Sequence, residues 1–198
     1  MSGNASDRGQ TFTLEAFIAA ILLISTVAFA RQAVAVTSNT AGASETELRG
    51  QHGGLAEGVL DRSVENGDLR RTLLYWNESE NRFHGAGGAE GFYVSTTPNT
   101  TFGDSLDAMF DGSGIRYNVD LHYLDEDGER QRQRMIEFGA PGDDAVRVVE
   151  TVTLYDHTEL VDADGTRREG ATLESVEDEF YASDAGADGP LYSVIRVE

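Results

Sequence analysis

The most constraining feature of the sequence is an uncharged apolar stretch near its start. From Ala16 to Ala30 no residue carries a charge, and the wider run that begins at Thr11 contains one charged residue, Glu15. About 20 apolar residues are needed for a helix to span a bilayer. The stretch is apolar on all sides of a helical wheel and lacks the amphipathic stripe of a globular helix. It therefore predicts a membrane helix or an export signal, not a core helix.

The position of this stretch divides the chain into three expected parts. Residues 1–10 form a cytoplasmic leader, residues 11–36 a transmembrane helix, and residues 37–198 a domain outside the cell. The small residues of Ala28-Phe29-Ala30 and Ala33-Val34-Ala35 also fit a signal-peptidase site. Cleavage there would release a soluble secreted domain, so both outcomes remain open at this point.

The charge of the chain excludes several classes of function. The chain has thirty-five acidic residues and fifteen basic residues, all of them Arg, so its net charge is -20. Such a surface repels nucleic acid phosphates, so we expect no nucleic acid partner. A dense carboxylate surface is typical of proteins that stay soluble in concentrated salt. Cysteine is absent, which excludes disulfides, thiol catalysis and Cys-based metal sites.

The pattern after the apolar stretch is first helical and then β. Apolar residues recur near a 3.6 period between residues 45 and 65, and Asn66-Gly67 is a stop signal. A second short helix is expected from Leu69 to Trp76, with Asp68 as its cap, and a helical insertion over residues 102–110. Period-2 alternation predicts strands over residues 115–123, 129–138, 146–155 and 191–197, with a further hairpin across 162–165.

The expected fold class is α+β. A long N-terminal transmembrane helix would lead into an amphipathic helix, and that helix would pack through Leu55, Val59 and Leu60 on a C-terminal antiparallel β-sheet.

No motif for catalysis or for metal binding is found. The four histidines, His52, His84, His122 and His157, are widely spaced, and no nucleophile elbow, phosphate loop or dinucleotide fingerprint occurs. The acidic turns at 125–128 and 162–165 lack the acid that a calcium loop needs at its twelfth position. We therefore expect no enzymatic activity, no metal and no cofactor.

Glu15 indicates what the apolar stretch does. A carboxylate inside a membrane segment costs about 2.5 kcal/mol or more when it is unpaired at depth, so it marks a functional position. The sequence Gly9-Gln10-Thr11-Phe12-Thr13-Leu14-Glu15 before an apolar stretch resembles the class III signal of type IV prepilins.

This resemblance implies a processing event and a set of partners. A membrane prepilin peptidase would cut after Gly9 or after Gln10, leaving Gln10 or Thr11 as the first residue. Glu15 would then register the subunit during assembly by pairing with a neighbour's new N-terminal amine. The implied partners are copies of the chain or other pilins, the prepilin peptidase, the pilus assembly machinery and the membrane.

The whole chain also resembles a family of pilin-like proteins of halophilic archaea. The shared stretches are the Arg8-Gly9-Gln10 start, Leu74 to Asn77, Pro98 to Gly103 and Gly189 to Tyr192. Two sequons, at Asn77 and Asn99, are candidate glycosylation sites outside the cell. We therefore expect a type IV pilin-like structural subunit, major or minor, of a cell-surface filament or secretion system. The alternative is a membrane-anchored or secreted binding module that does not polymerise.

Overall fold

A computed structural model describes residues 46–87, 91–185 and 189–198 of the chain. The chain divides into two units, Met1–Leu48 and Arg49–Glu198, and the second unit holds the sheets, the labelled helices and residues 49–65 of the helix that precedes them. The expected leader at 1–10 and the expected membrane segment at 11–36 lie outside the described residues.

Three α-helices of the described residues lie on one side of the second unit. The described part of the first covers residues 46–65, and this helix ends where Gly67 adopts a left-handed conformation, with φ 76°. The helix α2 (Asp68–Leu73) follows at once, and Gly67 occupies its N-cap position. The helix α3 (Thr101–Phe110) begins at Thr100, whose hydroxyl accepts a hydrogen bond from the backbone N–H of Gly103 at 3.3 Å.

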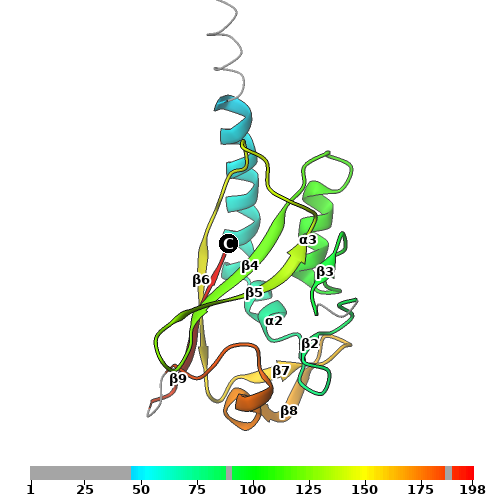
Figure 1. Cartoon of the computed structure of the whole chain (residues 1–198). Helices are drawn as coiled ribbons and strands as arrows, with labels where there is room; N and C mark the ends of the chain where they lie inside the picture. Colours follow the sequence, from blue (N-terminus) through cyan, green and yellow to red (C-terminus); the bar gives the residue numbers. More distant parts are fainter. Residues whose placement is uncertain (1–45, 88–90, 186–188) are drawn as a thin grey trace, which may run out of the picture. The chain divides into compact units, whose positions relative to one another are not determined.

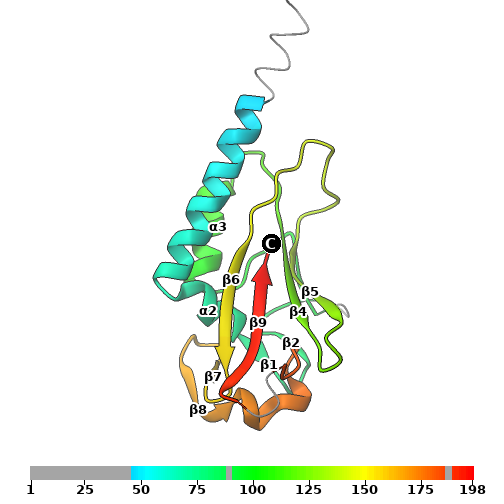
Figure 2. The ribbon, with the colours of Figure 1, turned by 90° about the vertical axis from the view of Figure 1, so that its left-hand side faces the viewer.

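The main sheet has five strands in the order β3-β5-β4-β9-β6 (Figures 1 and 2). These strands are β3 (Tyr93–Val94), β4 (Asn118–Leu124), β5 (Arg130–Glu137), β6 (Glu150–Tyr155) and β9 (Leu191–Val197). The short strand β3 pairs with β5 in parallel, and the other neighbours pair antiparallel. The sheet is therefore mixed.

Two small antiparallel ladders lie beside the main sheet. The strand β1 (Trp76–Asn77) pairs with β2 (Arg82–Phe83), and β7 (Glu159–Val161) pairs with β8 (Arg167–Thr172). A 3₁₀ segment, η1 (Leu173–Glu179), follows β8.

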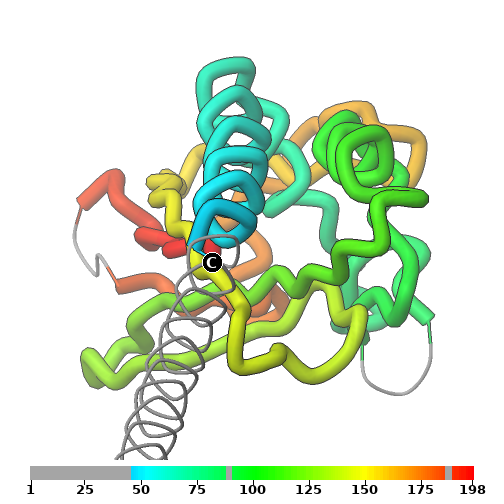
Figure 3. The backbone as a smooth tube through the Cα atoms, turned by 90° about the horizontal axis from the view of Figure 1, so that it is seen from above, coloured from blue at the N-terminus to red at the C-terminus, as the bar shows by residue number. Residues whose placement is uncertain are grey.

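The core lies between the sheet and the helices. Leu121, Leu154 and Ile195 project from one face of the sheet and are fully buried, as are Leu69 of α2 and Phe102 of α3. Figure 3 shows the helix over residues 46–65 and α3 on the same side of the β4–β5 hairpin. The sheet thus has a covered apolar face and an opposite face that carries polar side chains.

The expected fold class is wrong. It placed a long transmembrane helix and an amphipathic helix before an antiparallel sheet, whereas the described residues form a mixed, sheet-rich domain with a few helices. None of the helices in the described ranges is long and apolar enough to cross a membrane. The parallel pairing of Tyr93 with Ile136 was not foreseen, because two residues leave no periodic signal.

Two details of the expected helices are also corrected. Val59 and Leu60 are buried as predicted, but Leu55 is exposed, so the helix over residues 46–65 packs mainly through its last turns. The second helix ends at Leu73, and Trp76 belongs to β1, not to a helix. The hairpin of β4 and β5, the strand β9 and the helix α3 lie where the sequence predicted them.

Candidate functional site: an arginine-rich face of the sheet

The polar face of the main sheet concentrates arginine in an acidic chain. Strand register places Arg132, His122, Arg196 and Thr151 side by side in one row across β5, β4, β9 and β6. Residues directly opposite one another on paired strands share a face of the sheet. The row is exposed because the alternate residues, such as Leu121 and Ile195, point into the core.

We call this surface the arginine face. It consists of Arg130, Arg132, Arg134, Arg147 and Arg196, with Asp120, His122, Glu137 and Glu198 among them. Five positive charges meet three negative ones, which gives +2 with His122 neutral. The chain as a whole carries -20, so this face is the reverse of the average surface.

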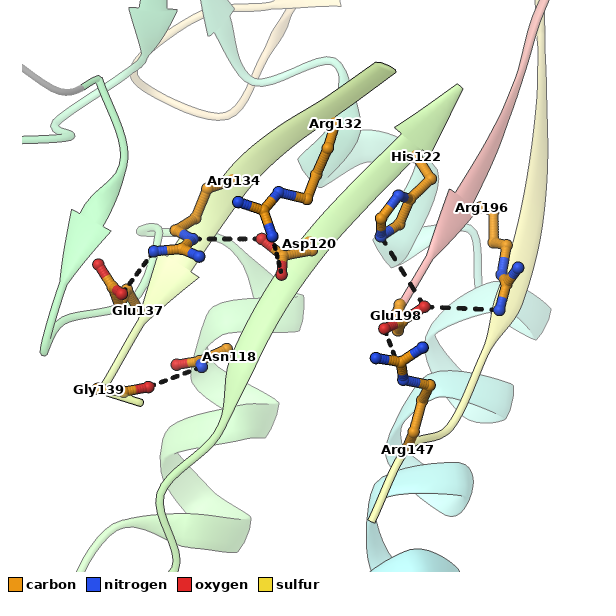
Figure 4. Close-up of polar contacts among 10 residues, drawn as sticks. All are labelled: Asn118, Asp120, His122, Arg132, Arg134, Glu137, Gly139, Arg147, Arg196 and Glu198. Atoms are coloured by element: carbon orange, nitrogen blue, oxygen red, sulfur yellow. Dashed lines mark hydrogen bonds and ion pairs between the residues drawn. The ribbon is translucent and has the colours of Figure 1, made fainter. Parts of the chain in front are cut away.

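Asp120 is the first centre of the polar network (Figure 4). Its carboxylate accepts a hydrogen bond from Nε of Arg134 at 3.3 Å and lies 3.8 Å from Nη1 of Arg132. Arg134 also donates through Nη1 to Glu137 at 2.5 Å. Arg134 is therefore held between two carboxylates, whereas the Arg132 side chain is 54% exposed.

Glu198 is the second centre. Its carboxylate lies 2.7 Å from Nε of Arg147, 3.5 Å from Nη2 of Arg196 and 3.8 Å from Nε2 of His122 (Figure 4). Only 15% of the Glu198 side chain is exposed, while Arg147 and Arg196 are 71% and 49% exposed. The backbone joins the two centres, since Asp120 and Glu198 exchange N–H···O bonds of 3.0 and 2.9 Å.

This geometry suits binding and not proton transfer. Each carboxylate already lies against at least one cation, and the arginines remain charged at all ordinary pH values. The guanidinium groups of Arg132, Arg147 and Arg196 expose donors that a further carboxylate could accept bidentately. Exposed Val194 adds an apolar contact on the same face, opposite Thr153 of β6.

A second group of charged residues holds the small ladders together. Arg168 of β8 donates through both terminal nitrogens to the carboxylate of Glu78, and its Nη1 lies 3.8 Å from Asp162. The hydrogen bond from Arg168 lowers the pKa of Glu78 below its usual range. This ion pair joins segments 90 residues apart, so its role is structural.

The Leu74–Asn77 stretch, which carried part of the family resemblance, is also structural. The indole Nε1 of Trp76 donates to the backbone carbonyl of Glu179 at 2.6 Å, and its ring packs edge-on against Phe83 and Tyr181. Tyr75 donates to the carbonyl of Ala163 at 2.9 Å. Burial raises the pKa of Tyr181 well above its ordinary value.

The predicted site residues fall in two groups. Gly9, Gln10, Thr11 and Glu15 lie outside the described residues. Asn99 is exposed just before α3. Asn77, in contrast, is half-buried in β1 rather than in a loop, and its side-chain oxygen accepts from the backbone N–H of Glu80 at 3.2 Å.

Two other kinds of site, a metal site and a ligand pocket, have less support in the described residues. In the described ranges no three His, Asp or Glu side chains gather closely enough to hold a metal ion. A shallow hollow of about 300 Å³ is lined partly by Arg70, Arg71 and Arg167, but none of its polar side chains is buried.

Sequence reasoning missed the arginine face, although the sequence held a signal for it. Arg130, Arg132 and Arg134 occupy every second position of the predicted strand over 129–138. Period-2 spacing puts them on one face. The contributions of Arg147, Arg196 and Glu198 depend on the pairing of β9 between β4 and β6, which local sequence does not reveal.

Comparison with known proteins gives one positive result. No curated protein and no solved structure matches the chain. One family model, described as a family of unknown function (DUF7288), matches residues 8–198. That match covers the N-terminal segment from Arg8 onward together with all the described residues. The chain therefore belongs to the DUF7288 family.

Proposed function

We propose that this protein is a pilin-like structural subunit, major or minor, of a cell-surface filament or secretion system. A prepilin peptidase would process it at the bond before or after Gln10, and Glu15 would guide its assembly with copies of itself or with other pilins. Before assembly the subunit would reside at the cell membrane with its N-terminus cytoplasmic and its sheet-rich domain outside. Its partners would be the peptidase and the assembly machinery.

The observation that carries this proposal is the sequence from Gly9 to Glu15 followed by the uncharged residues 16–30. The family match begins at residue 8, so it includes this segment. A carboxylate next to so many uncharged residues needs a partner, because an unpaired charge in an apolar setting is costly. A new N-terminal amine, created by cleavage a few residues upstream, is such a partner.

The described domain suits a role in packing. Its largest group of surface arginines forms ion pairs and leaves Arg132, Arg147 and Arg196 exposed for contact. This role needs no acid–base or nucleophilic centre. In a structural subunit the contacts between neighbouring copies carry the function.

Two variants of the full chain, expressed in its native host, test the proposal. Gly9→Leu should leave an unprocessed precursor, because Gly9 lies at or next to the bond that the peptidase would cut. Glu15→Gln should be processed but should not enter filaments. The matched control is Glu57→Gln, at an exposed position of the helix over residues 46–65. This variant should be processed and should enter filaments like the wild-type chain. Immunoblotting of cell and filament fractions separates these outcomes.

The proposal is wrong if Gly9→Leu is processed like the wild-type chain. If Glu15→Gln and the wild-type chain are both processed but neither is found in filaments, the protein is an anchored binding module and not a filament subunit.

A further inference from the structure

The arginine face exposes guanidinium groups that could bind further anions. Two of its carboxylates, Asp120 and Glu198, are at most about one-fifth exposed and lie beneath the cations. The side chains of Arg132, Arg147 and Arg196 are 49% to 71% exposed. An approaching molecule would therefore meet arginine first and carboxylate second. Arginine is among the residues enriched in protein interfaces, because its planar group pairs bidentately with carboxylates.

The same chain carries a compact acidic surface elsewhere in the second unit. In η1, the carboxylates of Glu174, Glu177, Asp178 and Glu179 are exposed. The apolar residues of that segment, Leu173 and Val176, are buried, so the acids point outward. Within the described ranges none of the four carboxylates has an ion-pair partner. We call this surface the acidic segment.

We propose that the arginine face of one copy binds the acidic segment of a second copy. One such contact leaves each copy with one free surface, so head-to-tail repetition of it is heterologous and builds a ring or an open chain of subunits. This inference rests on the proposed function, since it supplies the filament with a contact between outer domains.

The charge of the chain makes this contact selective. Copies that each carry -20 repel one another in most orientations. The arginine face is the place where the sign is reversed, so repulsion is relieved only when that face meets acidic surface. At about 1 M salt the screening length falls to roughly 3 Å, which removes long-range repulsion but leaves part of the attraction between groups in contact. Association is therefore expected to persist in concentrated salt.

A charge-swap experiment tests the contact directly. One full-length variant reverses the face through Arg132→Glu and Arg196→Glu. A second reverses the segment through Glu177→Arg and Asp178→Arg. Each variant alone should self-associate about tenfold or more weakly than the wild-type chain, because like charges then meet across the contact. An equimolar mixture should recover association, since each altered surface now finds its complement on the other variant.

Sedimentation velocity of the purified full-length chains in about 1 M salt measures these effects. Arg62→Glu changes an exposed arginine of the helix over residues 46–65, away from both surfaces, and should associate like the wild-type chain. Circular dichroism melting curves confirm that each variant is folded. Recovery in the mixture cannot come from misfolded protein, so it is specific to the proposed pair of surfaces.

The outcomes separate this inference from the proposed function. If the N-terminus is processed but the mixture does not recover association, the contact is wrong and the filament proposal stands. If the mixture recovers association but the N-terminus is never processed, the contact is right and the filament proposal is wrong. Loss of association in Arg62→Glu as well would show a general charge effect and overturn the contact.

Discussion

Among the glycines that the structure describes, Gly103 is the position where one added methyl group should disturb the fold most sharply. It lies in the first turn of α3, and its Cα faces the backbone of Pro98. A Cβ at this position would overlap the carbonyl oxygen of Pro98 and lie 3.0 Å from its carbonyl carbon and 3.3 Å from its Cγ. The obstacle is backbone, so no rotamer change can remove the overlap.

The free energy cost of Gly103→Ala depends on the contacts of Pro98 and Thr100, because the backbone of this segment must shift to admit the methyl group. The Pro98 oxygen accepts a hydrogen bond from the N–H of Thr100 at 2.8 Å, and the Thr100 hydroxyl caps α3 and lies 2.8 Å from the Thr72 hydroxyl on α2. Overpacking costs about 1–3 kcal/mol and a damaged N-cap about 1 kcal/mol. The higher helix propensity of Ala stabilises the helix by about 1 kcal/mol and offsets part of this cost. We expect a net destabilisation of roughly 2 kcal/mol, with a fall in Tm of about 4–8 °C.

The matched control is Gly58→Ala in the helix over residues 46–65. A Cβ there meets nothing within 4 Å, so only the helix propensity changes, and stability should stay equal or rise by about 0.5–1 kcal/mol. Thermal unfolding of the full chain at fixed salt, followed by the fluorescence of its single tryptophan, Trp76, measures both variants. A Gly103→Ala variant within about 0.5 kcal/mol of the wild-type chain would refute the reasoning.

Three more predictions concern the core, an ion pair and a sequon. Trp76→Phe should lower the free energy of unfolding by about 1–3 kcal/mol in urea titrations followed by circular dichroism, because the partly buried carbonyl of Glu179 loses its donor; no loss would contradict that role. Because Arg168 lowers the pKa of Glu78, the ion pair stabilises the fold above the unfolded pKa of about 4.3 and is lost as pH falls through the lower folded value. Arg168→Gln should therefore be less stable than the wild-type chain at pH 6, with a gap that narrows toward pH 3 in thermal melts; a gap independent of pH would contradict this. Glycopeptide mass spectrometry should find any glycan on exposed Asn99, and a glycan on Asn77 alone would be inconsistent with its half-buried position.

Local signals in the sequence were enough for the elements whose neighbours are close in the chain. The alternation over 115–123, the turn at 125–128 and the polar return strand predict the hairpin of β4 and β5, because its register depends on one short turn. The helix α3 was likewise predicted from a short local segment, and the structure shows Thr100 as its N-cap. The alternating arginines of β5 also held enough information to predict half of the arginine face.

Other parts depend on contacts that no local pattern reports. Leu69 and Leu73 are four residues apart and suggest a helix that runs on to Trp76, but the indole of Trp76 bonds to the carbonyl of Glu179, 103 residues away. Trp76 makes this contact from the strand β1, and the helix α2 ends before it, at Leu73. The parallel pairing of β3 with β5 similarly joins residues about 43 positions apart through two residues of strand. Its existence follows from the packing of the whole domain.

The mature N-terminus is the measurement that tests the filament proposal most directly. Mass spectrometry of the intact protein purified from its native host gives the first residue without any variant. A chain that begins at Gln10 or Thr11 agrees with cleavage by a prepilin peptidase and retention of the apolar residues 16–30. A chain that begins at Arg31 or Val36 would show removal of that stretch by a signal peptidase and would contradict the account.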